Sequence, residues 1–176
     1  MLPNAPKMKP LLSSTVLKER VTELGQQIAR DFHGEPVILI GVLKGSFIFF
    51  ADLVRSISLD LSVDFIGVAS YLGTASTGQV RITHDLSVAI DGKNVVLVED
   101  IVDTGITLDF LLDTMRVRNP KSLKICALLS KPEARHMHHP LDYVGFEITN
   151  EFVVGYGLDL DQRFRQLPDL MQVIEG

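Results

Sequence analysis

The sequence predicts an α/β fold with a mostly parallel central sheet flanked by helices, on three observations. Continuous apolar runs such as Val37–Val42 and Val95–Val98 are typical of strands that are buried on both faces. Segments with apolar residues at helical spacing alternate with these runs, as they do in parallel α/β proteins. The chain has 176 residues, 46% of them hydrophobic, which fits one domain (residues 1–176) with a sizeable core.

Three segments have the period of an amphipathic helix with one apolar face. The first follows Ser13 or Ser14, either of which could cap its N-terminus. Residues 46–57 form the second, and Thr107–Val117 form the third. The expected apolar faces are, in chain order, Leu17, Val21, Leu24 and Ile28; Phe47, Phe50, Leu53, Val54 and Ile57; and Leu108, Leu111, Leu112 and Met115.

The remaining apolar segments predict strands. These strands are Val37–Val42, Val63–Ser70, Val95–Val98, Ser122–Leu129 and Val144–Ile148, with Val173–Ile174 as a last edge piece. We expect turns at Gly41–Gly45 and Asp91–Gly92, a loop at Leu72–Gln79, and a loosely ordered start over residues 1–10. Ligands bind at the carboxyl ends of the strands in such sheets, so the chemistry is expected there.

Composition and charge exclude several classes of protein. The 17 basic and 22 acidic residues give a net charge of −5, which argues against a general nucleic-acid binder but not against a small anionic ligand. The single cysteine, Cys126, excludes a disulfide framework and is interpreted as an inert buried thiol. No apolar stretch approaches the roughly 20 residues that span a bilayer, and no signal-like segment is present. We therefore expect a cytoplasmic protein that binds neither membrane nor nucleic acid.

The most informative segment is VVLVEDIVDTGIT, residues 95–107. A buried strand is followed by Asp103-Thr104-Gly105 and then by the start of a helix. Backbone N–H groups at such a helix start, together with the hydroxyls of Thr104 and Thr107, can surround a phosphate group. Gly105 allows the backbone to approach the ligand closely.

Three carboxylates, Glu99, Asp100 and Asp103, flank this anion site and would repel a phosphate alone. Ribose hydroxyls can donate to carboxylates, and a divalent cation can bridge carboxylate and phosphate, so the pattern suggests a sugar phosphate with Mg²⁺. An ordinary loop with an Asp or Thr helix cap is the plain alternative. Two rival nucleotide motifs are absent: no GxGxxG follows a strand, and Leu43–Ser46 lacks the P-loop spacing.

Residues Glu99–Thr107 resemble the phosphoribosyl-pyrophosphate (PRPP) motif of the type I phosphoribosyltransferases. The resemblance continues in order through VLKGSFIFFADL (42–53), VDFIGVASY (63–71), STG (76–78), GKNVVLVED (92–100), LLSKP (128–132) and VGFEI…EFVVGYGLD (144–159). Within that family, Lys131 and Phe152–Asp159 are similar to the bacterial hypoxanthine-guanine branch. The resemblance implies a core with a small hood over the base site, formed by the terminal segments, and a homodimer or homotetramer.

The implied activity is transfer of the 5-phosphoribosyl group from PRPP to hypoxanthine or guanine, with Mg²⁺, to give IMP or GMP and pyrophosphate. Two rivals remain open. One is a phosphoribosyltransferase for another base: Lys131 and Phe152 argue against adenine and pyrimidines, whereas xanthine is harder to exclude. The other is a PRPP-sensing regulator that binds nucleic acid, which the acidic composition disfavours.

The resemblance also implies a role for each matching residue. Asp103 is the catalytic acid/base near purine N7. PRPP contacts come from Glu99, Asp100, Asp103, Thr104, Gly105, Ile106 and Thr107, and pyrophosphate contacts from Lys44, Gly45 and Arg165. The purine is bound by Lys131 at O6, by stacking on Phe152, by the backbone of Val153 and by Asp159. The expected Mg²⁺ ligands are Glu99, Asp100 and Asp159.

Three further features are expected or left open. The family's mobile lid begins at a pair that matches Ser70-Tyr71. The family often has a non-proline cis peptide where Leu43–Lys44 stands here. The His136–His139 cluster has no evident family role; a weak metal site is conceivable, but a solvent-exposed loop is the favoured interpretation.

Overall fold

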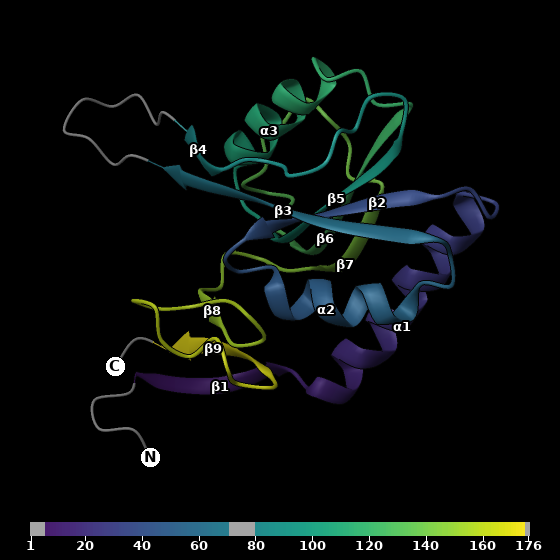
Figure 1. Cartoon of the computed structure of the whole chain (residues 1–176). Helices are drawn as coiled ribbons and strands as arrows, with labels where there is room; N and C mark the ends of the chain where they lie inside the picture. Colours follow the sequence, from purple (N-terminus) through teal and green to yellow (C-terminus); the bar gives the residue numbers. More distant parts are fainter. Residues whose placement is uncertain (1–5, 71–79, 175–176) are drawn as a thin grey trace.

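The computed structural model describes residues 6–70 and 80–174, and within them two sheets and three helices are present (Figure 1). The strands are β1 (Lys7–Leu12), β2 (Val37–Leu43), β3 (Leu61–Ser70), β4 (Val80–His84), β5 (Asn94–Val102), β6 (Ser122–Ser130), β7 (Tyr143–Glu147), β8 (Val153–Val154) and β9 (Leu170–Ile174). The helices are α1 (Ser14–Asp31), α2 (Phe47–Ser56) and α3 (Ile106–Arg116).

The central sheet has the strand order β4-β3-β2-β5-β6-β7 in the described part of the chain. Neighbouring strands from β3 to β7 pair in parallel, and β4 pairs antiparallel with β3 at the edge. Helices α1 and α2 cover one face and α3 covers the other, so each face buries its own hydrophobic cluster (Figure 1). The predicted α/β fold with a mostly parallel sheet flanked by helices is confirmed.

The apolar faces predicted for the first and third helices are buried as expected. Ser13 is the N-cap of α1, where its side chain accepts a hydrogen bond from the N–H of Val16. The face predicted for α2 is partly wrong: Phe47 is 43% exposed, whereas Phe49 is fully buried. The run Phe-Ile-Phe-Phe offers two adjacent apolar stripes, and only packing against the sheet decides between them.

Several strand predictions need correction at their ends. The strand predicted to stop at Val98 continues to Val102. The turn predicted at Gly41–Gly45 is shorter, because β2 runs to Leu43 and the turn covers residues 44–46. The peptide bond between Leu43 and Lys44 is cis, as the resemblance implied.

The chain's two ends form a three-stranded sheet in the order β1-β9-β8, which the local pattern did not predict. Residues 7–10, expected to be loosely ordered, lie in β1, and the predicted edge piece Val173–Ile174 belongs to the middle strand β9. Strands β4 and β8 were not predicted at all. Strands β1 and β8 take their backbone hydrogen bonds from β9, which is distant in sequence, and no short-range periodicity reports such a partner; β4 pairs with the preceding strand β3. The predicted loop Leu72–Gln79 lies in residues 71–79, outside the described residues.

The small sheet lies below the central sheet in Figure 1, on the side where β3 ends. A hood made of terminal segments was implied by the resemblance, and segments 7–12, 153–154 and 170–174 do come together here. The single domain over residues 1–176 stays a prediction. Cys126 is buried, as predicted, and burial raises the pKa of its thiol well above the usual range. None of the described helices is long and apolar enough to cross a membrane.

A buried carboxylate ties the connection between β4 and β5 to β3. Asp64 in β3 is 7% exposed and accepts hydrogen bonds from the N–H groups of Phe65, Ser87 and Val88 at 2.7–3.1 Å. Burial raises the pKa of Asp64, but these hydrogen bonds to the charged form outweigh it and leave the pKa below its usual 3.8.

We expect Asp64→Asn to lower the free energy of unfolding by roughly 1–3 kcal/mol, because the N–H groups that it accepts from lose a charged acceptor. Since the folded-state pKa is depressed, this stabilisation is complete above the unfolded pKa and disappears as the pH falls below about 4. Urea unfolding at neutral and acidic pH measures both effects. Asp60→Asn, at an exposed residue just before β3, is the control. Equal losses in the two variants contradict the assignment.

Candidate active site

Most of the predicted site residues lie where the parallel strands end. Glu99 and Asp100 occupy the last part of β5, and the loop Asp103–Thr107 leads from it into α3. Lys44 and Gly45 form the turn after β2, and Lys131 follows β6 directly. The N–H of Lys131 donates to the carbonyl of Val102 at 2.9 Å, which holds the start of that segment against the end of β5.

A cavity of about 140 Å³ lies inside the Asp103–Thr107 loop. It is lined by Glu99, Ile101, Val102, Asp103, Thr104, Gly105, Thr107 and Leu108. The N-cap of α3 is Gly105, in the left-handed region at φ 85°, and it has no side chain with which to cap the helix. The alternative of an Asp or Thr at the N-cap position is therefore wrong, although the N–H of Ile106 donates to Oγ1 of the preceding Thr104 at a long 3.5 Å. The N–H groups that follow in the first turn of α3 suit an anion.

A second cavity, of about 230 Å³, adjoins the first. It is lined by Asp100, Ile101, Asp103, Lys131, Glu151, Phe152, Val153, Leu158 and Asp159. Asp103 and Ile101 line both cavities. The Nζ of Lys131 lies 3.3 Å from Oδ2 of Asp103, so the two side chains predicted to handle the purine form an ion pair.

The aromatic and hydrophobic residues of this cavity differ in exposure. Phe152 is 52% exposed, which leaves its ring available to a flat ligand, whereas Val153 is buried in β8. Sequence reasoning missed Ile101, Leu158 and Glu151. Glu151 stands directly before Phe152, and its Oε2 is buried with no hydrogen-bond partner in the described residues. Its position next to Phe152, a predicted stacking residue, is the sequence signal that could have identified Glu151.

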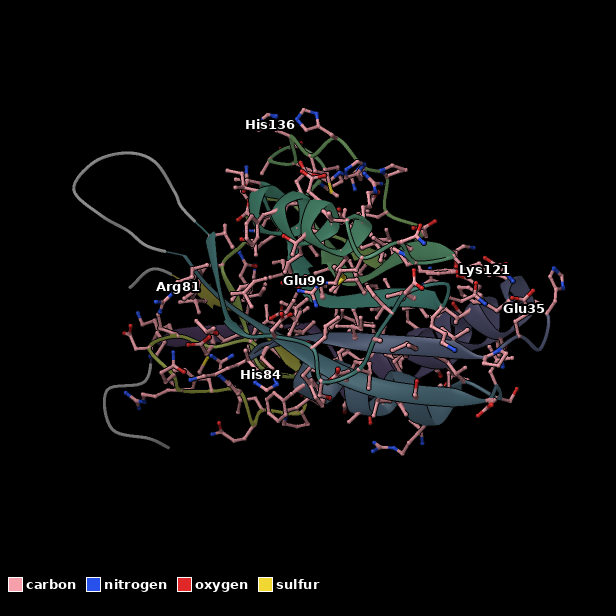
Figure 2. All side chains as sticks on the ribbon, turned by 45° about the horizontal axis from the view of Figure 1, so that its top comes forward. Glu35, Arg81, His84, Glu99, Lys121 and His136 are labelled. Carbon is pink, nitrogen blue, oxygen red and sulfur yellow. The ribbon has the colours of Figure 1, made fainter. Side chains whose placement is uncertain are left out.

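The acidic pair is less accessible than expected. Ligand contacts at the carboxyl ends of the strands call for exposed side chains, but Glu99 and Asp100 are both partly buried, and Figure 2 shows Glu99 well inside the molecule. Burial, followed by the neighbouring charge of Asp100, raises the pKa of Glu99 well above its ordinary value. Burial also raises the pKa of Asp100, and nearby Arg165 opposes that shift.

Two glycines bring the separate loops into contact. A Cβ on Gly45 would overlap Oδ2 of Asp100, so the carboxylate lies directly on the backbone of the turn after β2. A Cβ on Gly157, which has φ 107°, would overlap the carbonyl oxygen of Gly45. The turn after β2, the end of β5 and the segment before Asp159 therefore meet only because these positions carry no side chain.

Arg165 and Asp159, predicted to bind pyrophosphate and Mg²⁺ respectively, face each other. Their ion pair is 2.6 Å long, and the Arg165 guanidinium also donates to the carbonyl of Gly157 at 2.7 Å. The second oxygen of Asp159 accepts the N–H of Gln162 at 2.8 Å. Both Asp159 oxygens are thus engaged by protein groups. Lys44 is exposed beside this pair of loops.

The carboxylates fit a magnesium ion that is completed by substrate oxygens. Within the described residues, no group of three or more His, Cys, Asp or Glu side chains could hold a metal ion by itself, so the three predicted ligands do not form a ready-made cage. Mg²⁺ usually takes one or two carboxylates together with substrate phosphate oxygens and waters. Glu99, whose buried Oε2 has no hydrogen-bond partner among the described residues, and Asp100 supply such a donor pair.

Two other regions of the chain bear on the location of the site. The lid predicted to begin at Ser70-Tyr71 cannot be located, because Ser70 ends β3 and Tyr71 lies outside the described residues. A larger cavity of about 670 Å³ lies between α1, α2 and residues 166–168, and none of the predicted site residues lines it. The two smaller cavities at the ends of the strands are therefore the candidate active site.

A comparison with protein families agrees with this geometry. The model of the phosphoribosyl transferase domain matches residues 10–161. The chain belongs to the phosphoribosyltransferase family. A hypoxanthine phosphoribosyltransferase of Buchnera aphidicola is 46% identical over 170 residues, which are 95% of this chain and 96% of that protein. A hypoxanthine-guanine phosphoribosyltransferase of Mycobacterium avium is 46% identical over 164 residues, covering 89% of this chain and 81% of the relative.

Solved phosphoribosyltransferase structures have the same fold. The crystal structure of a hypoxanthine-guanine phosphoribosyltransferase from Bacillus anthracis, with a HEPES molecule in its active site, has 48% sequence identity and a TM-score of 0.92. The superposition covers 97% of this chain and all of that one. A hypoxanthine phosphoribosyltransferase from Staphylococcus aureus has 41% identity and a TM-score of 0.91, over 97% of this chain and 93% of that one.

Proposed function

We propose that the protein transfers the 5-phosphoribosyl group of PRPP to hypoxanthine or guanine, as an enzyme of purine salvage. The observation that carries this proposal is the position of Asp103, which lines both the cavity at the helix start and the cavity that holds Lys131 and Phe152. A sugar phosphate in the first cavity and a base in the second would meet beside this carboxylate. Relatives with hypoxanthine and hypoxanthine-guanine names support this substrate class.

The first cavity suits the 5-phosphate of PRPP. Open N–H groups at the start of α3 and the hydroxyls of Thr104 and Thr107 offer donors on several sides of an anion. The carboxylates of Glu99 and Asp100 suit the ribose hydroxyls, which can donate to them. Lys44 and Arg165 bring positive charge near the side on which the pyrophosphate leaves, with Arg165 exchanging its contacts to Asp159 and Gly157 for the substrate.

In nucleotide synthesis a purine nitrogen forms a bond to ribose C1 while the bond between C1 and the pyrophosphate oxygen breaks. The imidazole ring of the purine then has one proton to lose, and the Asp103 carboxylate accepts it. Lys131 donates to the exocyclic O6, which adenine lacks. Phe152 provides a ring for the base to stack on.

Glu99 and Asp100 would hold Mg²⁺, and Asp159 is the third ligand expected from the resemblance. Bound there, the ion would neutralise charge on the departing pyrophosphate as a Lewis acid.

A turnover panel tests the proposal: hypoxanthine, guanine, xanthine and adenine are each supplied with PRPP and Mg²⁺, and product nucleotide and pyrophosphate are measured. We expect IMP and GMP with equal amounts of pyrophosphate. If only xanthosine nucleotide forms, the result favours the alternative in which the enzyme acts on xanthine. RNA or DNA binding without any turnover favours the nucleic-acid-binding regulator. The sequence argues against that alternative, because it has no stripe of basic residues.

Lys131→Ala should weaken binding of hypoxanthine by about 10-fold and relax the choice against adenine, because the donor to O6 is lost. The ratio of kcat/KM for hypoxanthine and adenine measures this. Lys121→Ala is the matched control. Lys121 directly precedes β6, at the opposite end of that strand from Lys131, and pairs with Glu35 (Figure 2). An unchanged ratio in the Lys131 variant rejects the O6 contact.

Cytoplasmic location and a homodimer or homotetramer are also part of the proposal, supported by the sequence pattern and the family resemblance. Cell fractionation and light scattering of the purified protein measure them directly. A monomer in solution would contradict the expected assembly.

A further inference from the structure

The segment after Lys131 returns along the outside of the Asp103–Thr107 loop. The N–H of His136 donates to the carbonyl of Thr104 at 3.0 Å. The N–H of His138 donates to Oδ2 of Asp109, in the first turn of α3, at 3.1 Å. Between these two hydrogen bonds stands Met137. Three consecutive residues thus attach this segment to the loop and to the helix that follows it.

Met137 packs on Gly105, the residue of that loop with left-handed backbone. A Cβ built on Gly105 would lie 2.6 Å from Cβ of Met137 and 3.2 Å from its Cγ. Gly105 itself is buried, has φ 85° and lines the 140 Å³ cavity. The same glycine therefore touches the proposed phosphate position and the methionine side chain. Met137 is half-buried and packs on the hydrophobic cluster under α3.

The histidines around Met137 do not converge on a common point. His136 is exposed, and Figure 2 shows its ring pointing away from the molecule. His138 is exposed and contributes its backbone N–H, while His139 pairs with Arg116. In the part of the chain that the structure describes, these rings join no group that could hold a metal ion. The interpretation of residues 136–139 as only a solvent-exposed loop is wrong at Met137.

We infer that Met137 is a positioning residue for the 5-phosphate of PRPP, an inference that rests on the proposed function. Glycine adopts the left-handed conformation of Gly105 without strain but has many other conformations open to it, so packing against the residue is what holds it in this one. The Met137 side chain and the His136 N–H act on two successive residues of the loop, Thr104 and Gly105. Together they keep the first N–H groups of α3 directed at the phosphate. An unbranched methionine suits this irregular gap.

Met137→Ala keeps the Cβ nearest to Gly105 but removes Cγ and Sδ, which also lie beside the glycine, and the loop can then move into the space they leave. Displacements near 1 Å cost up to 100-fold in enzymes, and partial relaxation here should raise KM for PRPP by about 10-fold. The values of kcat and of KM for hypoxanthine should change by less than about 2-fold, because the loss falls on binding that ground state and transition state share. Met137→Leu, which conserves volume, should restore KM for PRPP.

Met115→Ala is the matched control. Met115 is buried in the same hydrophobic cluster and lies near the other end of α3, about 15 Å from Gly105 by helix rise. The control should lower the midpoint of thermal unfolding without raising KM for PRPP. If Met137→Ala proves insoluble, Met137→Val removes fewer side-chain atoms at the same contact.

A second measurement separates this inference from the proposed function. Calorimetry with ribose 5-phosphate as the probe requires no turnover, and its Kd should rise about 10-fold in Met137→Ala and remain unchanged in Met115→Ala. Wild-type protein that binds ribose 5-phosphate but forms no nucleotide defeats the proposed function alone. Equal Kd and KM values in wild type and Met137→Ala, with a lowered thermal midpoint, overturn the inference and leave Met137 as a core residue.

Discussion

Asp103→Asn lowers kcat for nucleotide synthesis by about 10²–10⁴-fold, the usual contribution of a general acid or base, while PRPP affinity changes little. Asparagine keeps the shape of the side chain and can still accept a hydrogen bond from Lys131, whose Nζ lies 3.3 Å from Asp103. It cannot take the purine proton. The side chain of Asp103 is 54% exposed, and Lys131, which is 12% exposed, keeps an acceptor in the asparagine oxygen, so the fold survives.

Steady-state rates with saturating hypoxanthine, combined with calorimetry of PRPP binding, separate the two quantities. Asp113→Asn is the control, since Asp113 lies on α3 with its side chain 75% exposed and lines neither cavity. A kcat close to that of wild type would mean that Asp103 only stabilises its loop. A large rise in the Kd for PRPP with unchanged kcat would mean that Asp103 contributes to binding and not to proton transfer.

An excess of chelator should reduce nucleotide synthesis by roughly 10²-fold or more, because stabilisation of transition-state charge by a bound metal ion is worth several kcal/mol. The reason lies in the site itself. Glu99 and Asp100 stand partly buried beside the proposed position of a polyanion, and the Oε2 of Glu99 has no hydrogen-bond partner in the described residues. A cation is needed between these charges. Added Mg²⁺ should restore the rate.

Glu99→Gln tests whether this carboxylate is responsible. Removing a group that only hydrogen-bonds to a metal ligand typically lowers metal affinity about 10–100-fold. Loss of a carboxylate ligand should therefore raise the half-saturating Mg²⁺ concentration by at least about 10-fold. Glu147→Gln, at the exposed end of β7, should leave it unchanged. The thermal midpoint of each variant checks the fold. Full synthesis in excess chelator removes Mg²⁺ from the proposal, and an unchanged Mg²⁺ requirement in Glu99→Gln removes Glu99 from the metal site.

The parts of the fold that could be predicted are those in which a residue's environment follows from its near neighbours. The buried face of α3 is Leu108, Leu111, Leu112 and Met115, because helical period alone places these residues on one side. Ser13 caps α1 because the cap bond is local. The Asp103–Thr107 loop could likewise be recognised, since a strand end, a loop and a helix start are contiguous in the chain.

Other features of the site depended on residues far apart in sequence. Lys131 and Asp103 form an ion pair because β5 and β6 are neighbours in the sheet. The sequence of neither strand predicts which other strand it pairs with. Contacts of Gly45 with Asp100 and with Gly157 depend equally on how the loops assemble. The resemblance to a family anticipated that these residues belong together. It did not anticipate the burial of Glu99 or the pairing of Arg165 with Asp159.

The sequence by itself determined the α/β class, the order of the main strands and helices, and the loop on which the proposed chemistry depends, since each rests on hydrophobic period or on a contiguous motif. Tertiary structure alone decided that Phe49 rather than Phe47 faces the core, that β9 is the middle strand of the small sheet, and that Met137 lies against Gly105. The physical reason is the same in each case. Local pattern reports what a segment can bury, whereas the partner that buries it is supplied by distant residues.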